Sequence, residues 1–341
     1  MDFNLQLFAD DSAVINKTTS EATGNNLSAE NKTFYDKQLI RLAGSKLVFS
    51  KFGQKRDIPQ NGGKTIEFRQ FSPLPKAMTP LTEGVTPDGQ ALNVTSKTAT
   101  VRQYGGYVTV TDMLDLTAID KVVLETVEIV GSQAGKTLDS VVRNVLMAGT
   151  NVQYGDGTVS ARNVLVGGAT EGNNYLTVDA LEKAVTTLKK QNAEPMDDGY
   201  YVAIVHPSVA YDLMRDPKWA EYNKYTPGNA EKLLKGEIGC IAGCRIIETT
   251  EAKIWKGTTD GGKDGRAVYA TLVLGKNAYG VTELTGGGLR TIIKQLGSAG
   301  TGDPLDQRST VGWKAIQTAE ILVDQYMVRV ETCSSYNDDA N

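Results

Sequence analysis

The sequence predicts an α+β fold, in which strands and helices gather in separate stretches instead of alternating along the chain. Three observations support this prediction. Two strand-like runs flank a proline-rich segment within residues 62–112, one long helical period covers residues 119–148, and short helices and strands are mixed after it. The chain has 341 residues, which suits one elaborate domain or two linked ones.

The N-terminal part of the chain divides into two segments of opposite charge. Residues 1–30 carry five acidic side chains against Lys17 alone, a net charge of −4, and the polar stretch 9–31 predicts a flexible arm. Residues 31–61 carry seven cations against two acids, a net charge of +5, and Phe34–Phe49 follows a helical period. The basic segment is either a solvated helix face or a surface that docks on an acidic patch of a neighbouring molecule.

A long β-hairpin with an irregular tip is predicted between Gly62 and Asp112. The runs Lys64–Phe71 and Thr98–Thr111 alternate in polarity and are rich in β-branched and aromatic residues. The segment between them cannot form a helix because it contains four prolines, Pro73, Pro75, Pro80 and Pro87. Since an isolated hairpin is only marginally stable in water, we expect this arm to lie on a neighbouring molecule. The arm therefore indicates assembly rather than catalysis.

A single long helix is predicted from Ile119 to Ala148. Apolar residues recur there in steps of three or four. A rise of about 1.5 Å per residue gives this helix a length of roughly 45 Å. Gly131 and Gly135 interrupt the pattern, and we expect them to allow close packing against another backbone. The helix cannot span a membrane because it carries Glu125, Glu128, Lys136, Asp139 and Arg143.

The C-terminal part of the chain mixes short helices with short strands. A glycine-rich linker, Gly149–Gly168, precedes a helix at Thr177–Gln191, and Thr177 is its expected N-cap. Pro207 suits the start of a helix at Ser208–Arg215, and a further helix is predicted at Asn229–Gly236. The predicted strands are Tyr200–Val205, Cys240–Glu248, 267–274, 278–284, 289–296 and Ile316–Val330.

The overall composition excludes several classes of partner. A net charge of −4 and a pI near 5.3 leave no global basic field to hold nucleic acid. Three cysteines do not make a disulfide framework, which favours a reducing compartment. The sequence has no membrane span and no secretory signal, so a soluble protein made in cytoplasm is expected. Aromatic residues and cations alternate in Phe68–Phe71, so a nucleic-acid-binding module stays an alternative.

No segment completes a nucleotide-binding loop. Three segments approach the pattern GxxxxGK[ST], in which backbone N–H groups and a lysine hold phosphates. In Gly257–Lys263 the next residue is Asp264, which would repel phosphate. The segments around Lys64 and Lys136 lack the first glycine, and they lie before a predicted strand and inside the long helix. We therefore expect no nucleotide hydrolysis.

The remaining candidates for chemistry favour structural roles. His206 is the sole histidine, and its place before Pro207 at a strand-to-helix turn suits a structural side chain. Cys240 and Cys244 are too few to complete a zinc site. The pair Asp197-Asp198 suits a solvated turn. We therefore expect no catalytic residue, no cofactor, no metal and no enzyme activity, with an unrecognised hydrolase as the alternative.

Several segments resemble a known family. They are LTEGVTPDGQALNVTSKTATVRQYGGYVTVTDMLDLTAID (Leu81–Asp120), YVAIVHPSVAYDLMRDPKW (Tyr201–Trp219), GEIGCIAGCRIIET (Gly236–Thr249) and the opening NLQLFA (Asn4–Ala9). Together with the order of arm, hairpin, long helix and mixed remainder, they resemble tailed-phage major capsid proteins with the Hong Kong 97-type fold. The likeness is to the branch typified by the podophage N-four coat protein.

The resemblance implies an α+β Hong Kong 97-like capsid fold with five parts. These are an N-terminal arm and first helix (1–61), an extended β-hairpin loop (62–112), a peripheral domain with a spine helix (113–170), an axial domain (171–290), and return strands with an acidic tail (291–341). The loop would lie over the adjacent subunit. The expected contact residues there are Arg69, Lys76, Pro80, Glu83 and Arg102.

The resemblance also implies partners. The chain would form hexamers and pentamers of an icosahedral shell around packaged double-stranded DNA, which it would bind without sequence specificity. A separate scaffolding protein, a portal and a decoration protein are the other expected partners, with no membrane and no cofactor. Assembly in the host cytoplasm would place the product in the virion capsid. The shell of a cellular nanocompartment with the same fold is the alternative.

Overall fold

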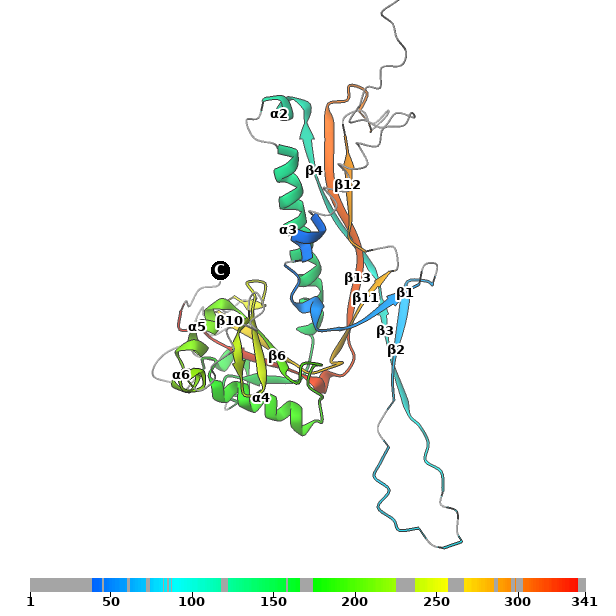
Figure 1. The fold of residues 1–341 in the computed structure, drawn as a ribbon, viewed down its shortest axis with the longest axis vertical. Helices are drawn as coiled ribbons and strands as arrows, with labels where there is room; N and C mark the ends of the chain where they lie inside the picture. The colour runs from blue at the N-terminus through cyan, green and yellow to red at the C-terminus, as the bar shows by residue number, and fades with distance from the viewer. Residues whose placement is uncertain are drawn as a thin grey trace, which may run out of the picture. The chain divides into compact units, whose positions relative to one another are not determined.

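The structure is a computed structural model that describes residues 39–44, 46–59, 62–71, 74–81, 83–84, 86, 88–117, 122–157, 159–165, 174–224, 237–256, 267–284, 288–295, 298 and 303–336. It has two compact units. The first comprises Met1–Ser45, Gly105–Ala134 and Leu289–Lys314, and the second comprises Lys46–Tyr104, Gly135–Gly288 and Ala315–Asn341. Helix α3 (Val122–Leu146) and strand β13 (Arg308–Ile321) contribute residues to both units (Figure 1).

The first unit combines part of α3 with strands around the first half of β13. This half pairs with β12 (Arg290–Lys294) and with β4 (Arg102–Thr111). Gly312 lets β4 approach closely, since a Cβ there would lie 2.8 Å from the Cβ of Tyr107. The indole N–H of Trp313 donates to Oε1 of Gln133 at 3.2 Å and so joins the sheet to α3.

The predicted long helix corresponds to α3, and a separate short helix lies before the predicted range. Helix α2 (Asp112–Thr117) begins directly after β4, where Oγ1 of Thr111 accepts a hydrogen bond from the N–H of Leu114 at 3.4 Å. Helix α3 has 25 residues, so its length is about 37 Å. It ends at Leu146, and the N–H groups of Ala148 and Gly149 bond to carbonyls three positions back, so the chain tightens after the helix. The predicted end at Ala148 was wrong, and the predicted start at Ile119 lies outside the described residues.

Gly131 allows the close packing that the sequence predicted. Residues 39–44 are helical, and Leu39 is fully buried against α3. A Cβ on Gly131 would lie 3.3 Å from the carbonyl oxygen of Leu39, tighter than an ordinary contact. The predicted first helix was too long, because Phe49 belongs to a separate 3-10 helix, η2 (Phe49–Lys51). Its first residues and the predicted arm 9–31 lie outside the described part of the chain.

The second unit contains a sheet covered by helices. The strand order is β5 (Val152–Tyr154), β14 (Met327–Thr332), β10 (Val268–Leu274), β6 (Tyr201–Val205), β8 (Cys244–Glu248) and β7 (Glu237–Ile241), with β9 (Ile254–Trp255) also on β10. The pairs β5–β14 and β6–β8 are parallel, and the other pairs are antiparallel. Strands β6 and β10 are buried along their whole length, which matches their continuous apolar sequences.

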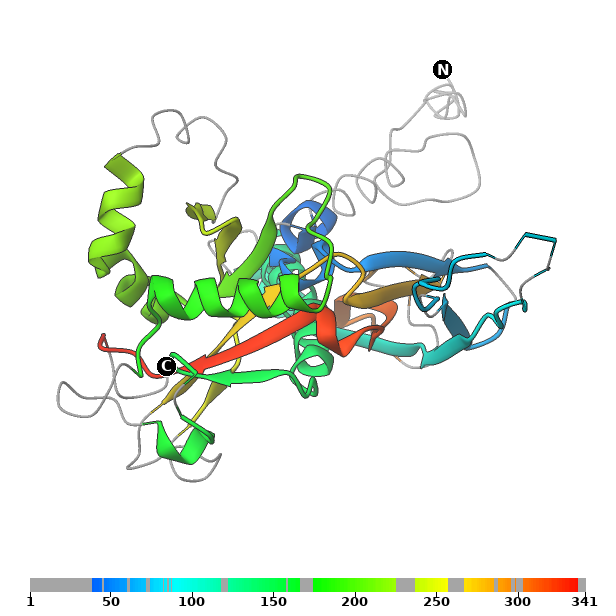
Figure 2. The ribbon, with the colours of Figure 1, turned by 90° about the horizontal axis from the view of Figure 1, so that it is seen from below.

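Three helices accompany this sheet, namely α4 (Val178–Lys190), α5 (Pro207–Arg215) and α6 (Pro217–Lys224). Figure 2 shows α4, in green, lying along β14, in red. The prediction for α4 is confirmed: the side chain of Thr177 accepts a hydrogen bond from the N–H of Ala180. The apolar residues Val178, Leu181, Val185 and Leu188 of this helix are buried. Helix α6 was not predicted, and the predicted helix Asn229–Gly236 lies outside the described residues.

Two predictions about C-terminal strands and one about a linker were wrong. Cys240–Glu248 is the hairpin β7–β8, which turns at Ala242 (φ 54°) and Gly243 (φ 75°), and two positive φ angles suit a tight hairpin turn. Ile316–Val330 contains the end of β13 and most of β14, which belong to different sheets and are separated by the 3-10 helix η7 (Asp324–Tyr326). The predicted linker Gly149–Gly168 includes β5 and the 3-10 helix η3 (Arg162–Val164).

A smaller group of strands in the second unit carries the hairpin. Strand β1 (Gln54–Ile58) runs parallel to β11 (Tyr279–Leu284), and β11 is antiparallel to the second half of β13. The core beneath them includes Phe49, Val142, Leu146 and Tyr279. These side chains fix the base from which the predicted arm extends.

Candidate assembly surface

The arm is a hairpin of β2 (Thr65–Phe71) and β3 (Val94–Thr100). The strands are antiparallel, with Phe71 opposite Val94 at the outer end of the ladder. Figure 1 shows the two strands running on into a long irregular loop. The predicted return strand Thr98–Thr111 was wrong, because pairing starts earlier and β4 leaves the hairpin to pair with β13. The chain changes partner at Val101, which is buried.

The root of the arm is the part of the hairpin that packs on its own subunit. Phe68 is 4% exposed and Ala99 is 2% exposed, and both lie on the same face of β2–β3. The ring of Phe68 lies over Gly280 of β11, where a Cβ would be 2.7 Å from the ring carbons. The guanidinium of Arg56 lies 5.9 Å from the centre of the same ring. The root therefore depends on a glycine in a distant strand.

Beyond the root, the described residues of the arm form no core of their own. Every described residue from Arg69 to Thr98 is exposed. Large apolar side chains are among them, and Met78 is 81% exposed. The others are Phe71, Leu74, Leu81, Leu92 and Val94. A contiguous segment with this much exposed apolar surface marks an interaction site.

The predicted contact residues do not all lie on the arm. Lys76, Pro80 and Glu83 lie in the loop, and all three are exposed. Arg69 lies on β2 just beyond the root and pairs with Glu67 at 3.2 Å. Arg102 is exposed as well, but it begins β4 and is outside the hairpin ladder. The structure therefore brings three of these residues into one loop and places the other two on strands at its base.

Sequence reasoning missed the apolar residues of the loop and the glycine beneath the root. Leu74, Met78 and Leu81 follow the prolines closely, and apolar residues in a segment that cannot be a core element were a usable signal. Gly280 gave no such signal, because its partner Phe68 is far away in the sequence.

Gly280→Ala is expected to weaken the root. The new methyl group would overlap the ring of Phe68, so we expect a loss of about 1–3 kcal/mol in the free energy of unfolding. Urea unfolding would measure this loss, and limited proteolysis of the arm would report its loosening. Gly44→Ala is the control, since a Cβ on Gly44 meets nothing within 4 Å. Phe68→Leu should recover part of the loss in the double variant, and a fully stable Gly280→Ala protein would contradict the account.

A buried carboxylate holds the segment that leads into β1. Asp139 of α3 is fully buried, and its Oδ1 accepts hydrogen bonds from the N–H groups of Val48 at 2.9 Å and Ser50 at 3.3 Å. Its Oδ2 has no hydrogen-bond partner among the described residues. Desolvation raises the pKa of Asp139 to about 6, against the lowering effect of these backbone bonds. The hydroxyl of Tyr279 donates to the carbonyl of Phe49 in the same segment.

Asp139 makes stability depend on pH in a defined direction. Its pKa of about 6 in the folded state lies above the ordinary value of 3.8, so the folded state binds the proton more tightly. This contribution to stability is complete below pH 3.8 and is lost as the pH rises to about 6. Asp139→Asn keeps an acceptor at Oδ1 and removes the titration. We expect the variant to gain up to roughly 3 kcal/mol relative to the wild type between pH 4 and pH 7.

Urea unfolding at several pH values would measure this difference. Asp57→Asn, at an exposed aspartate of β1, is the matched control and should follow the wild type. A constant stability difference between Asp139→Asn and the wild type across this range would contradict the assignment.

The contacts of His206 are those of a structural side chain. It is 2% exposed, its Nδ1 accepts a hydrogen bond from the N–H of Ser208 at 3.2 Å, and it caps α5. Its ring lies 4.9 Å from that of Tyr269, and burial lowers the pKa of the imidazole. The capped helix begins at Pro207, as the sequence predicted.

The other sequence candidates are not brought together into a reactive site. Cys240 and Cys244 lie on the two strands of the β7–β8 hairpin, and burial raises the pKa of both thiols. Asp197 pairs with Lys276 and Asp198 with Arg245, both at 2.6 Å. Within the described residues, no group of three or more His, Cys, Asp or Glu side chains could hold a metal ion. None of the helices among those residues is long and apolar enough to cross a membrane.

The phosphate-loop near-matches lack the required setting. Lys64 precedes the first residue of β2 rather than a helix, and Lys136 lies inside α3, where it pairs with Glu251 at 3.1 Å. Gly257–Lys263 lies outside the described residues.

A buried charge cluster ties the end of the chain to the second unit. Glu331 of β14 is fully buried and pairs with Arg162 at 2.6 Å and with Arg329 at 2.8 Å. The guanidinium of Arg162 lies 3.7 Å from the ring centre of Trp255. Arg329 also donates to the carbonyl of Gly149 at 3.1 Å, just after α3. Each ion is paired and hydrogen-bonded, which indicates a structural cluster.

Comparison with known proteins points to a structural class. Residues 94–327 match the family model described as phage capsid protein. No curated protein sequence matches the chain. The matched residues include β3, the whole of α3 and the larger sheet of the second unit except β14, of which only Met327 is covered.

Solved structures with a similar fold include several capsid chains. The capsid of Ralstonia phage GP4 aligns with a TM-score of 0.65 and 16% identity over 100% of both chains. A chain of the cyanophage P-SCSP1u capsid aligns with a TM-score of 0.59 and 13% identity over 85% of this chain and 89% of its own. A chain of the head of Helicobacter pylori bacteriophage KHP40 aligns with a TM-score of 0.59 and 13% identity, over 82% of this chain and 88% of its own. At these identities the likeness is one of fold.

Proposed function

The chain belongs to the phage capsid protein family, and from this premise we propose that its arm is the element by which one subunit holds the next in the shell. The fold is the α+β Hong Kong 97-like capsid fold, and the chain is a structural major capsid protein of a tailed phage. The alternative of a nanocompartment shell is not favoured, because the matched family is one of phage capsid proteins.

One observation carries the proposal. The loop beyond the root exposes apolar side chains over its described length and has no core of its own. A second copy that covers the loop would bury this surface, with a gain of about 25 cal/mol for each Å² of apolar area removed from water. In this proposal the apolar loop residues supply most of the contact energy. Arg69, Lys76, Glu83 and Arg102 are exposed charges, which contribute about 0–1 kcal/mol each, and Pro80 lies among the apolar residues of the loop.

The finer organisation of the capsid belongs to the same proposal. Residues 113–170 would serve as a peripheral domain, residues 171–290 as the axial domain, and residues 291–341 as its return strands and tail. Subunits would form hexamers and pentamers in the host cytoplasm, with a scaffolding protein, a portal, a decoration protein and packaged double-stranded DNA as partners. No catalytic step is assigned to the chain, since His206 and the paired carboxylates already have structural contacts.

Oxidation of Met78 offers a direct test of the proposed contact. The thioether is 81% exposed in the subunit, so hydroxyl radicals should oxidise it readily in free protein. In assembled shells we expect its oxidation rate to fall by about tenfold, because a neighbouring copy would exclude water from it. Met327 is 1% exposed and serves as the internal reference for a folded subunit. Equal oxidation of Met78 in subunits and shells would refute the contact.

A further inference from the structure

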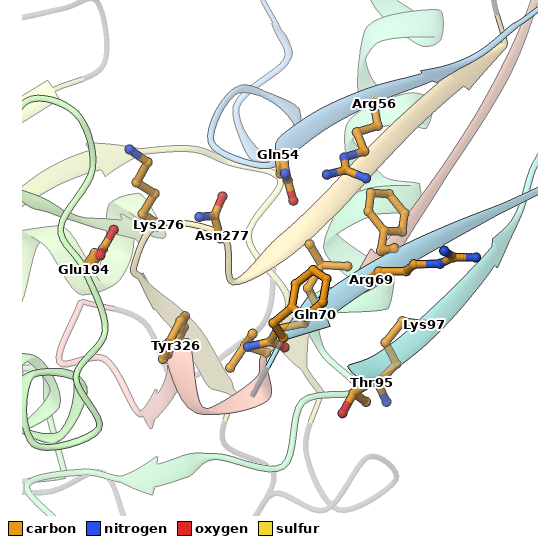
Figure 3. A pocket seen from close by; sticks show the side chains of 14 residues that line it. Gln54, Arg56, Arg69, Gln70, Thr95, Lys97, Glu194, Lys276, Asn277 and Tyr326 are labelled. Carbon is orange, nitrogen blue, oxygen red and sulfur yellow. The ribbon is translucent and has the colours of Figure 1, made fainter. Parts of the chain in front are cut away.

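A groove lies beside the root of the arm, within the second unit. Its volume is about 340 Å³, and it lies between β1 on one side and β2 and β3 on the other (Figure 3). Small-molecule sites begin at about 300 Å³, so the groove has room for one small ligand or for one residue of a polymer. Its lining includes Phe68–Phe71. The groove therefore contains the aromatic and cationic stretch that kept nucleic-acid binding open as an alternative.

The two strands of the arm present one face to the groove. Phe68 lies directly opposite Lys97, and Gln70 is two positions further along β2, so these three side chains share a face of the hairpin. All three line the groove. Phe71 and Tyr326 add aromatic rings to the wall, and Phe71 is 63% exposed. A flat ligand can therefore reach an aromatic ring beside a cation.

The rim of the groove is cationic. It is lined by four cations and a single carboxylate, namely Arg56, Arg69, Lys97, Lys276 and Glu194. Figure 3 shows that the four cations come from β1, β2, β3 and a separate turn. Arg69 and Lys276 have acidic partners, whereas Arg56 and Lys97 have none among the described residues. The groove should therefore attract an anion locally, although the whole chain is acidic.

Three primary amides also line the groove. Figure 3 shows Gln54 and Asn277 on one side of it and Gln70 on the other. Within the described part of the chain, the side chains of these three residues make no hydrogen bond. An amide presents a donor and an acceptor side by side, which is the pattern that pairs with the edge of adenine. A carboxylate can only accept hydrogen bonds, so this set of cations and amides favours a nucleotide over an acidic peptide.

We propose that the groove binds a nucleoside phosphate, either free or as an unpaired residue of a strand. The phosphate would lie between Arg56 and Lys97, and the base would stack on Phe71. The amides would pair with the edge of the base. This inference goes beyond the proposed function, and its test does not need assembly, because all the lining residues belong to one subunit.

Titration of the purified, unassembled full chain with dATP tests the proposal. Isothermal titration calorimetry should give one saturable site per chain. Inorganic tripolyphosphate, which has charge but no base, should bind about tenfold more weakly, as the loss of one stacked base predicts. Equal affinities for the two would show that the rim attracts any anion and would overturn the proposal. A short glutamate peptide that binds as tightly as dATP would overturn it in favour of a peptide site.

Matched variants locate the site. Arg56→Gln with Lys97→Gln should weaken dATP binding by about tenfold, because two charged donors to the phosphate are lost. Lys55→Gln with Lys64→Gln removes the same charge at exposed positions outside the groove and should leave dATP binding unchanged. Phe71→Ala should weaken the binding of dATP by about tenfold but not that of tripolyphosphate. Equal losses in the two double variants would overturn the proposal.

Photoaffinity labelling with 8-azido-dATP maps the site on the wild-type chain. The label should appear on the tryptic peptides 70–76 and 315–329, which contain Phe71 and Tyr326. Label found only on other peptides would contradict the assignment.

A single-stranded octanucleotide of deoxyadenosine distinguishes the two sources of the ligand. Tighter binding of dATP identifies a free nucleotide, and tighter binding of the strand identifies unpaired residues of nucleic acid. A duplex of the same length should bind more weakly than the strand, because its bases are already paired and stacked. A duplex that binds as tightly as the strand, or a subunit that binds neither dATP nor the strand, overturns this inference. Shells formed by such a subunit would leave the proposed function standing.

Discussion

Replacing residues 72–93 with an Asn-Gly turn is expected to give a folded subunit that no longer forms stable shells. Phe71 and Val94 lie opposite each other, so a two-residue turn can close the hairpin at this point. The removed loop contributes no buried residue to its own subunit among those described. The shorter loop should therefore raise the free energy of unfolding by about 2 kcal/mol at most, so the subunit should stay folded. Assembly should fail because the exposed apolar surface of the loop is gone.

Sedimentation velocity and electron microscopy would measure the loss of shells, and urea unfolding would check the subunit. Substitutions in the loop and at the end of β2 refine the test. Phe71→Ser with Leu81→Ser should weaken assembly more than Lys76→Ala with Glu83→Ala, because apolar burial contributes more than exposed charge. Arg102→Ala serves as a control outside the loop. Normal shells from the turn variant, or a turn variant that does not fold, would count against the account.

Glu331→Ala is expected to destabilise the second unit strongly. It would leave Arg329, whose side chain is 9% exposed, without its carboxylate in a buried site. Removing one partner of a buried ion pair lowers the free energy of unfolding by about 3–5 kcal/mol. Arg162 would lose its ion pair with Glu331 at the same time, although its packing on Trp255 would remain.

Thermal and urea unfolding of the purified subunit would measure this cost. The control is Asp197→Ala, because Asp197 pairs with Lys276 at the surface and its side chain is 85% exposed. That change should cost no more than about 1 kcal/mol. Glu331→Gln, which keeps the shape of the side chain, provides a milder variant if the alanine variant does not fold. If Glu331→Ala and Asp197→Ala lowered the free energy of unfolding by the same small amount, the buried charge cluster would not stabilise the subunit as proposed.

Local signals in the sequence predicted the elements that depend on local contacts. Helix α4 carries its cap at Thr177 and its apolar stripe within its own sequence, so both were predictable. The arm was predictable because prolines exclude a helix between two alternating runs. The family followed from segments that resemble capsid proteins, and the match over residues 94–327 confirms it.

The missed features depend on contacts between distant parts of the chain. Residues 316–330 have strand-forming sequence throughout, and only the packing of two different sheets ends β13 and starts β14. The same holds for Thr98–Thr111, where the change of partner at Val101 is set by β13. The contact of Phe68 with Gly280 joins two strands that are far apart in the sequence, so no local sequence pattern predicts it.

Electron cryomicroscopy of shells assembled from the full chain tests the central claim most directly. We predict that residues 74–92 lie over a neighbouring copy, with Met78 and Leu81 buried by it, while Phe68 stays on Gly280 of its own subunit. A loop that folds back on its own subunit, or that stands in solvent without touching a neighbour, would contradict the account.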